Sequence, residues 1–175
     1  PGIRSAGCGH LIGLDPEEEP ALPTIEFFFD FASPFAYLAH VRLPEIADRF
    51  GLDIAYRPID LFEARRAAGN TGPSTPQVPA KFRYIRKDIQ RWAWRYGVPF
   101  VFPPADPSQP GGIRKDQVDS TRAHKAMFLA IRRSQGREFA RAVWSRTYAT
   151  GGFIGDDANL VGASIELGWD PEEVF

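Results

Sequence analysis

The chain has 175 residues, of which 43% are hydrophobic and 25% are charged, and its formal net charge is −1. The length predicts one domain, and the composition is typical of a globular protein with a substantial core. The charge balance gives no indication of a nucleic-acid partner or an anionic membrane, and no hydrophobic run approaches the roughly 20 residues of a membrane span.

Residues 1–22 form a poorly patterned lead-in that lacks the basic start and apolar stretch of a signal peptide. Cys8 is the single cysteine, which excludes a disulfide within the chain. A protein without disulfides fits a reducing compartment, so we expect a cytoplasmic location. Because the sequence does not begin with Met, we expect a processed chain or a part of a longer protein.

The first patterned segment, residues 24–31, is an apolar run of strand length that is rich in aromatic residues. Residues 34–50 predict a helix that ends at Gly51, and residues 52–59 alternate as a second strand. Together the segments have the size of a βαβ unit, whose strands are expected to be parallel. Pro44 should kink or divide the helix. The residues expected on its buried face are Phe35, Leu38, Val41 or Arg42, Ile46 and Phe50.

The chain beyond Asp60 is predicted to be mainly helical, with a turn-rich loop and a Pro-rich connection between helices. The segments expected to form helices are residues 61–69, 80–96, 114–135, 137–149 and 157–167. The residues expected to begin or end them include Gly69, Gly136, Gly151-Gly152, Asp156 or Asp157, and Gly168. The buried face expected for the second helix consists of Phe82, Ile85, Ile89, Trp92 and Tyr96.

The last residues, "WDPEEVF", have the pattern of a helix start. Asp170 is the expected cap, Pro171 the first helical residue and Glu173 the partner in a capping box. A sheet of two parallel strands is also unusually small. Both observations lead us to expect that C-terminal material is missing.

Ser33 lies between the first strand and the helix, directly before Pro34. Its simplest role is that of an N-cap, whose hydroxyl accepts a hydrogen bond from the first helical turn. A second role uses the partial positive charge of a helix N-terminus, which favours a bound thiolate. A serine there could donate a hydrogen bond to the thiolate sulfur, and the two roles are compatible.

Several motifs in this order resemble the 2-hydroxychromene-2-carboxylate isomerases, relatives of kappa-class glutathione transferases in the DsbA-like thioredoxin superfamily. The motifs are "FFFDFASPFAYLA", "YRPIDL", "GNTGPS" and "KFRYIRKDIQRWAWRYGVPFVFP", within a resemblance that covers about residues 24–175. It implies an α/β fold with a thioredoxin-like βαβ half at residues 23–60 and a helical insertion domain at residues 61–175. The C-terminal half of the thioredoxin-like domain is then apparently absent.

The resemblance also implies where glutathione binds. DsbA-like oxidoreductases have Cys-x-x-Cys at this turn, whereas here the turn begins with Ser33, Pro34 and Phe35. Dithiol exchange needs both cysteines, and the family instead uses its serine to hold the glutathione thiol. Asn70 and Lys81 match two further glutathione contacts. From the residues alone, Asn70 is equally a left-handed turn residue and Lys81 a solvated charge on a helix.

Other polar residues have simpler interpretations. Asp30 and Asp60 lie at strand ends, where α/β folds bind ligands, and Asp30 is read as an ordinary hydrogen-bonded acid that could orient the turn. His40 and His124 are read as structural.

Two aromatic residues have a possible functional role. Trp92, like Phe35, could line an aromatic substrate pocket, although packing is the simpler role. No Cys/His cluster has the spacing of metal ligands.

The resulting hypothesis is a glutathione-dependent isomerase of 2-hydroxychromene-2-carboxylate-type aromatic catabolites, with glutathione as cofactor and nucleophile. One alternative is a kappa-like glutathione transferase or peroxidase that takes other electrophiles. Another is a non-catalytic, truncated DsbA-like interaction module, because an unpaired sheet edge is prone to pair with another chain. The expected partners are glutathione and a small aromatic substrate, with a homodimer left open and no nucleic acid or membrane.

Overall fold

The computed structural model describes residues 22–105 and 118–174. The elements are β1 (Thr24–Phe29), α1 (Pro34–Phe50), β2 (Asp53–Pro58), α2 (Leu61–Ala67), η1 (Thr75–Gln77), α3 (Pro79–Tyr96), α4 (Thr121–Arg132), α5 (Gly136–Arg146), α6 (Asp157–Glu166) and η4 (Pro171–Val174). The lead-in with Cys8, the second half of the Pro-rich connection and the start of the helix expected at residue 114 lie outside the described residues. Among the described helices, none is long and apolar enough to cross a membrane.

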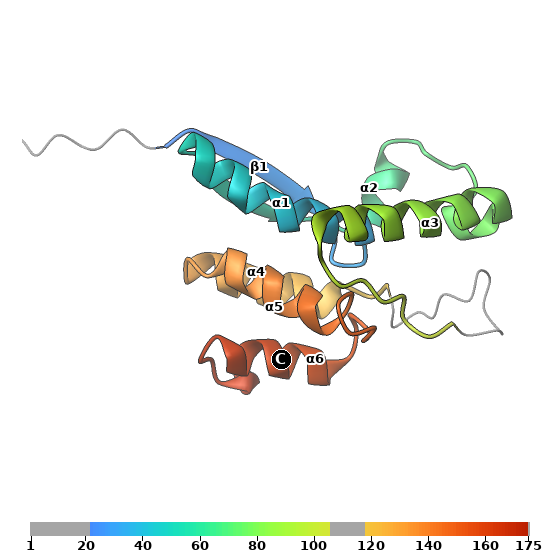
Figure 1. Cartoon of the computed structure of the whole chain (residues 1–175). Coiled ribbons are helices and arrows are strands. Elements are labelled where there is room, and N and C mark those ends of the chain that lie inside the picture. The colour runs from blue at the N-terminus through green and yellow to red at the C-terminus, as the bar shows by residue number, and fades with distance from the viewer. Residues whose placement is uncertain (1–21, 106–117, 175) are drawn as a thin grey trace, which may run out of the picture.

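The two strands pair in parallel, with Thr24 opposite Asp53 and Phe29 opposite Pro58, as the sequence predicts. Side chains alternate along β1, so that Phe29 is buried while Phe28 is 58% exposed. Helix α1 connects the strands and packs against β2, which completes the expected βαβ unit. In Figure 1 this unit and α3 lie above α4 and α5, and α6 lies below them.

Helix α1 has the predicted bounds because its ends have strong local signals. Ser33 is the N-cap, Pro34 is the first helical residue, and Gly51 closes the helix with φ of 62°. Pro44 lies inside the helix and does not divide it. The predicted buried face is correct for Leu38 and wrong for Phe35, Ile46 and Phe50, which are exposed. The residues that α1 buries are Tyr37, Leu38, His40, Pro44 and Ala47.

The helical part follows the prediction in element order but not at every boundary. Gly136 was expected to end a helix and instead begins α5, because the chain turns two residues earlier at Ser134, with φ of 57°. The predicted bounds of α6 are nearly correct, with Asp156 as the N-cap. Glu173 does not act as expected for a capping box, because its carboxylate pairs with the Arg133 guanidinium at 2.7 Å.

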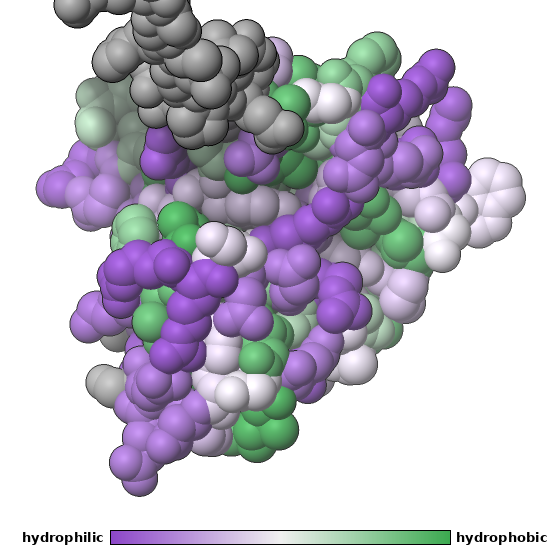
Figure 2. All heavy atoms as spheres, turned by 90° about the vertical axis from the view of Figure 1, so that its left-hand side faces the viewer, coloured by the Kyte–Doolittle hydropathy of each residue, from purple (hydrophilic) through white to green (hydrophobic). Residues whose placement is uncertain are grey.

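The face predicted for α3 is only partly buried. Ile89 and the neighbouring Ala93 are buried in α3, whereas Trp92 is 39% exposed. Trp94, on the same helix, is 85% exposed. Figure 2 shows the side of the molecule that lies on the left in Figure 1, where hydrophilic side chains cover much of the surface and hydrophobic ones appear between them.

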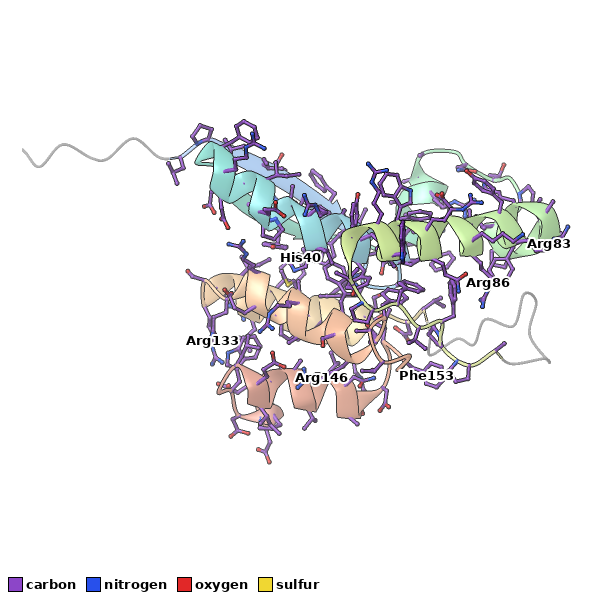
Figure 3. All side chains as sticks on the ribbon, viewed as in Figure 1. His40, Arg83, Arg86, Arg133, Arg146 and Phe153 are labelled. Carbon is purple, nitrogen blue, oxygen red and sulfur yellow. The ribbon has the colours of Figure 1, made fainter. Side chains whose placement is uncertain are left out.

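The core is an aromatic cluster around Trp144 of α5, which is fully buried. Its indole ring lies 5.4 Å from the ring of Phe29 and 5.1 Å from that of Phe31, between ring centroids. His40 of α1 packs on the same indole at 5.0 Å and faces the lower helices in Figure 3. Strand β1, the turn after it and helices α1 and α5 therefore share one core, and this packing fixes the position of the turn.

Candidate functional site

The candidate site begins at the turn from β1 into α1. The Ser33 N–H donates to the Asp30 carbonyl at 3.0 Å, and the Ser33 hydroxyl oxygen accepts from the Ala36 N–H at 3.3 Å. The N-cap role predicted for Ser33 is therefore confirmed. A hydroxyl that accepts a hydrogen bond still has its own proton to donate. Ser33 is half-buried, so this geometry is compatible with a ligand above the helix N-terminus.

Two side chains of the helical part bind the backbone of this turn. The Trp144 indole N–H donates to the carbonyl of Phe31 at 3.2 Å, and the Tyr148 hydroxyl donates to that of Ala32 at 2.5 Å. Phe31 itself is fully buried. Burial raises the pKa of Tyr148, which keeps its hydroxyl protonated as a donor. The segment that carries Ser33 is thus held by contacts more than 100 residues away along the chain.

Asp30 is the most connected polar residue of the turn. One carboxylate oxygen accepts from the Ala32 N–H at 2.9 Å and from the Ser120 hydroxyl, and the other accepts from the Leu61 N–H at 2.9 Å. Burial raises the pKa of Asp30, but the contact with His124 and the hydrogen bonds from Ser120, Leu61 and Ala32 together outweigh it and hold the pKa below its usual value. The carboxylate is therefore ionised at neutral pH.

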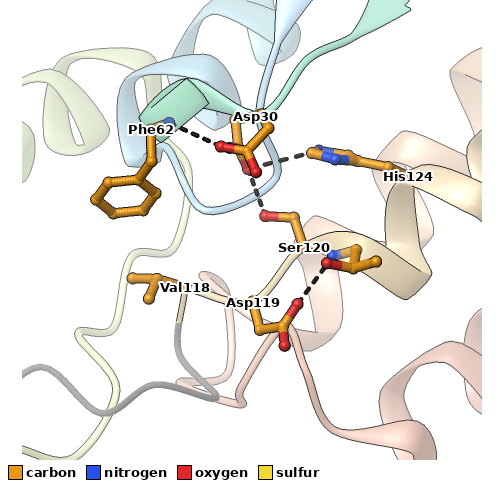
Figure 4. A pocket seen from close by; sticks show the side chains of 8 residues that line it. Asp30, Phe62, Val118, Asp119, Ser120 and His124 are labelled. Carbon is orange, nitrogen blue, oxygen red and sulfur yellow. Dashed lines mark hydrogen bonds and ion pairs between the residues drawn. The ribbon is translucent and has the colours of Figure 1, made fainter. Parts of the chain in front are cut away.

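A cavity of about 270 Å³ opens beside Asp30, at the carboxyl ends of the two strands (Figure 4). Its lining residues are Asp30, Asp60, Phe62, Val118, Asp119, Ser120, Thr121 and His124. The His124 Nε2 atom lies 3.5 Å from the nearer Asp30 oxygen and has no hydrogen bond of good geometry to any described residue. Ligands of open α/β sheets bind at this edge.

The residues predicted to bind glutathione do not line this cavity. Phe35 is 43% exposed, and Lys81 is exposed near the start of α3. Asn70 is also exposed, and its N–H donates to the Arg65 carbonyl at 2.9 Å, which joins it to the end of α2. Within residues 22–105 we find no hydrogen bond or ion pair that links Ser33, Asn70 and Lys81.

Sequence reasoning missed the polar partners on α4. Ser120 and His124 are four residues apart, so both side chains lie on one face at the start of α4. That spacing was the available signal, but nothing in the sequence indicates their proximity to Asp30, 90 residues before Ser120. Within residues 22–105 and 118–174, no group of three or more His, Cys, Asp or Glu residues is placed to hold a metal ion.

Comparison with known proteins first defines the class. The family model of the DSBA-like thioredoxin domain matches residues 24–175. A solved structure of selenomethionine 2-hydroxychromene-2-carboxylate isomerase superposes with a TM-score of 0.74 and 32% identity, over 86% of this chain and 68% of that one. The α/β, DsbA-like fold expected from the sequence is thereby confirmed.

Curated relatives narrow the class. The chain is 38% identical to the 2-hydroxychromene-2-carboxylate isomerase of Sphingobium xenophagum, over 85% of this chain and 70% of the relative. For the isomerase of Pseudomonas putida the identity is 34%, over 83% and 66%. Glutathione S-transferase kappa 1 of Caenorhabditis elegans is 26% identical, over 89% and 67%. The chain therefore belongs to the 2-hydroxychromene-2-carboxylate isomerase family, and it spans about two thirds of the length of these relatives.

Proposed function

We propose that the protein is a glutathione-dependent isomerase of 2-hydroxychromene-2-carboxylate-type compounds. The observation that carries the proposal is the Ser33 hydroxyl at the N-terminus of α1, at the position of the Cys-x-x-Cys motif in DsbA-like oxidoreductases. The curated relatives at 33–38% identity are named as isomerases of this compound. Kappa-class glutathione transferases among the relatives support glutathione as the cofactor.

The residues at the turn fit a bound thiolate. In the first turn of α1, Pro34 has no N–H and the Ala36 N–H is bonded to Ser33, which leaves the Phe35 N–H to face a ligand, and the helix dipole adds partial positive charge. Both stabilise an anionic sulfur, and Ser33 has a proton to donate toward it. Glutathione, when bound, would supply the nucleophilic thiolate for the isomerisation. The protein would lower the thiol pKa, orient the sulfur and exclude water from it.

The distribution of charge favours the α3 side of the Ser33 turn, and not the cavity beside Asp30, for an anionic substrate. Three carboxylates line the cavity beside Asp30, and they would repel an aromatic carboxylate. Helix α3, which packs against α1, is basic instead. Its basic residues are Lys81, Arg83, Arg86, Lys87, Arg91 and Arg95, against the single acid Asp88. Two of them, Arg83 and Arg86, are labelled in Figure 3. We therefore place the substrate carboxylate toward α3, with Lys81 and Asn70 as further contacts of glutathione.

The first test is calorimetric titration of glutathione into the protein and its Ser33→Ala variant at neutral pH. A charge-assisted hydrogen bond contributes about 1.5–3 kcal/mol, so we expect affinity to fall about 10- to 100-fold. S-methylglutathione, which has no ionisable thiol, should bind both proteins equally. Ser74→Ala, at the N-cap of η1, is the matched control and should leave both affinities unchanged.

Turnover of the chromene substrate then decides the reaction itself. We expect isomerisation that requires glutathione and that Ser33→Ala slows. Absence of turnover by the folded protein with glutathione present would refute the proposal. The kappa-class relatives favour a second candidate, a transferase or peroxidase, which would instead consume glutathione with electrophiles or peroxides.

A further inference from the structure

Three elements meet at one buried carboxylate, that of Asp30, which is 4% exposed. We propose that Asp30 is a positioning residue that couples the two glutathione contacts, Ser33 and Asn70, by holding the start of α1 and the start of α2 against α4. This inference rests on the proposed function for its catalytic meaning. The coupling itself is a property of the fold that is measurable without glutathione.

On the α1 side, Asp30 fixes the turn that carries Ser33. Its carboxylate accepts the Ala32 N–H at 2.9 Å, and its main-chain carbonyl accepts the Ser33 N–H at 3.0 Å. These bonds set the backbone just before α1, and hence the direction of the Ser33 hydroxyl. An N-cap hydroxyl that rotates away from the helix axis could no longer donate to a thiolate there.

On the α2 side, the second carboxylate oxygen accepts the Leu61 N–H, the first N–H of the helix, at 2.9 Å. Asp60 caps the same helix at its next two N–H groups, Phe62 and Glu63. Asp60 therefore acts within α2, whereas Asp30 joins α2 to the turn before α1. Asn70 follows α2 and is bonded to it through the Arg65 carbonyl, so its place depends on that of the helix.

On the α4 side, Ser120 donates its hydroxyl to the Asp30 oxygen that also binds Ala32. His124 lies 3.5 Å from the same oxygen (Figure 4). The three groups that hydrogen-bond to the carboxylate, the Ala32 and Leu61 N–H groups and the Ser120 hydroxyl, all donate to it, so no orientation of an amide would suit them. In Asp30→Asn the amide NH₂ would face either the Leu61 N–H or the Ala32 and Ser120 donors, which breaks the junction on one side.

The decisive readout is the thiolate fraction of bound glutathione, measured from ultraviolet absorbance at neutral pH. Removing a negative charge near the sulfur would by itself favour the thiolate, so electrostatics alone predicts a higher fraction in Asp30→Asn. Loss of the Ser33 orientation predicts a fall of about twofold or more. A role limited to global stability would leave the fraction unchanged, because only folded protein binds. A fall supports the proposal, and either other result overturns it.

A double-mutant cycle tests whether Asp30 acts through Ser33. Asp30→Asn should weaken glutathione binding about tenfold in the parent and by a clearly smaller factor in a Ser33→Ala background, where only the contribution through Asn70 remains. Equal losses in the two backgrounds would refute the coupling. Asp156→Asn makes the same chemical change at the N-cap of α6, away from this turn, and should leave binding unchanged.

Amide hydrogen exchange separates failure of this inference from failure of the proposed function. In Asp30→Asn the amides of Ala32, Leu61 and Asn70 should exchange about tenfold faster, while those in the middle of α5 keep their rates. Acceleration confined to Ala32, or spread equally over the core, would refute the coupling. If the parent does not bind glutathione, the proposed function fails, and the exchange result still decides whether Asp30 couples the two helices.

Discussion

The buried imidazole of His40 is held neutral by its surroundings. Burial lowers its pKa to about 4, with a smaller contribution from the positive charges of Arg137 and Arg141. The Tyr56 hydroxyl lies 3.3 Å from Nδ1, and burial raises the pKa of this tyrosine. Tyr56 therefore stays protonated, and its hydroxyl is a donor to the tautomer of His40 that carries its proton on Nε2. This structural role agrees with the sequence interpretation of His40.

The neutral histidine should make stability depend on pH. Between about pH 6.5 and 4 the unfolded state binds a proton at His40 that the native state excludes, so stability falls as pH falls through this range. The shift of the pKa from 6.5 to about 4 corresponds to on the order of 3 kcal/mol. Urea unfolding at about pH 7 and pH 4.5 measures the loss. In His40→Gln it should shrink markedly, and an equal loss in both proteins would contradict this assignment.

At the scale of elements, the connection from α5 to α6 depends on a tight approach at Gly152. A Cβ there would overlap the Arg146 carbonyl oxygen and lie 2.8 Å from Asn159 Nδ2. The carbonyl belongs to the last turn of α5, so relief requires a backbone shift. The connection thus admits no side chain at this point.

We expect Gly152→Ala to lower the free energy of unfolding by about 1–3 kcal/mol, as overpacking does. Chemical denaturation measures the change. Gly72→Ala is the control, because the nearest atom to its Cβ, Asn70 Oδ1, is 3.8 Å away. The control should stay within about 0.5 kcal/mol of the parent. Similar effects of the two substitutions would show that the close approach at Gly152 is not rigid.

Element boundaries were predictable where one residue carries the signal. Ser33, Pro34 and Gly51 define α1 by cap chemistry alone, and Asp156 does the same for α6. Buried faces were less predictable, because they depend on what packs against a helix. On α1 the buried stripe includes His40, whose hydrogen-bond partner, Tyr56, lies on another element.

The candidate site also has a part that could be predicted from local sequence and a part that could not. Ser33 was recognisable because its cap position and its motif are local in sequence. The junction at Asp30 was not, because Ser120 and His124 come from another element. Asp30 was interpreted as a hydrogen-bonded strand-end acid, and its bond to Ala32 agrees with that. Its link to α4 depends on tertiary packing, which a sequence pattern does not contain.

At the scale of the whole molecule, the core joins the βαβ unit to the later helices through Trp144. The indole packs against Phe29 and Phe31 and donates its N–H to the Phe31 carbonyl. A side chain shared by both parts in this way couples their stabilities, because loss of its packing is felt on each side. The fold should therefore unfold as one cooperative unit.

Trp144→Phe tests this unity by removing ring volume and the N–H donor together. We expect a loss of about 2 kcal/mol, equivalent to roughly 30-fold in the equilibrium between folded and unfolded states. Amide exchange should then accelerate by the same factor in β1 and in α5, because both open through the same global transition. Trp94→Phe, at an 85% exposed position, should change neither rate by more than about twofold. If exchange accelerates in α5 while β1 keeps its rate, the two parts unfold separately. The helices would then not be what holds the Ser33 turn in place.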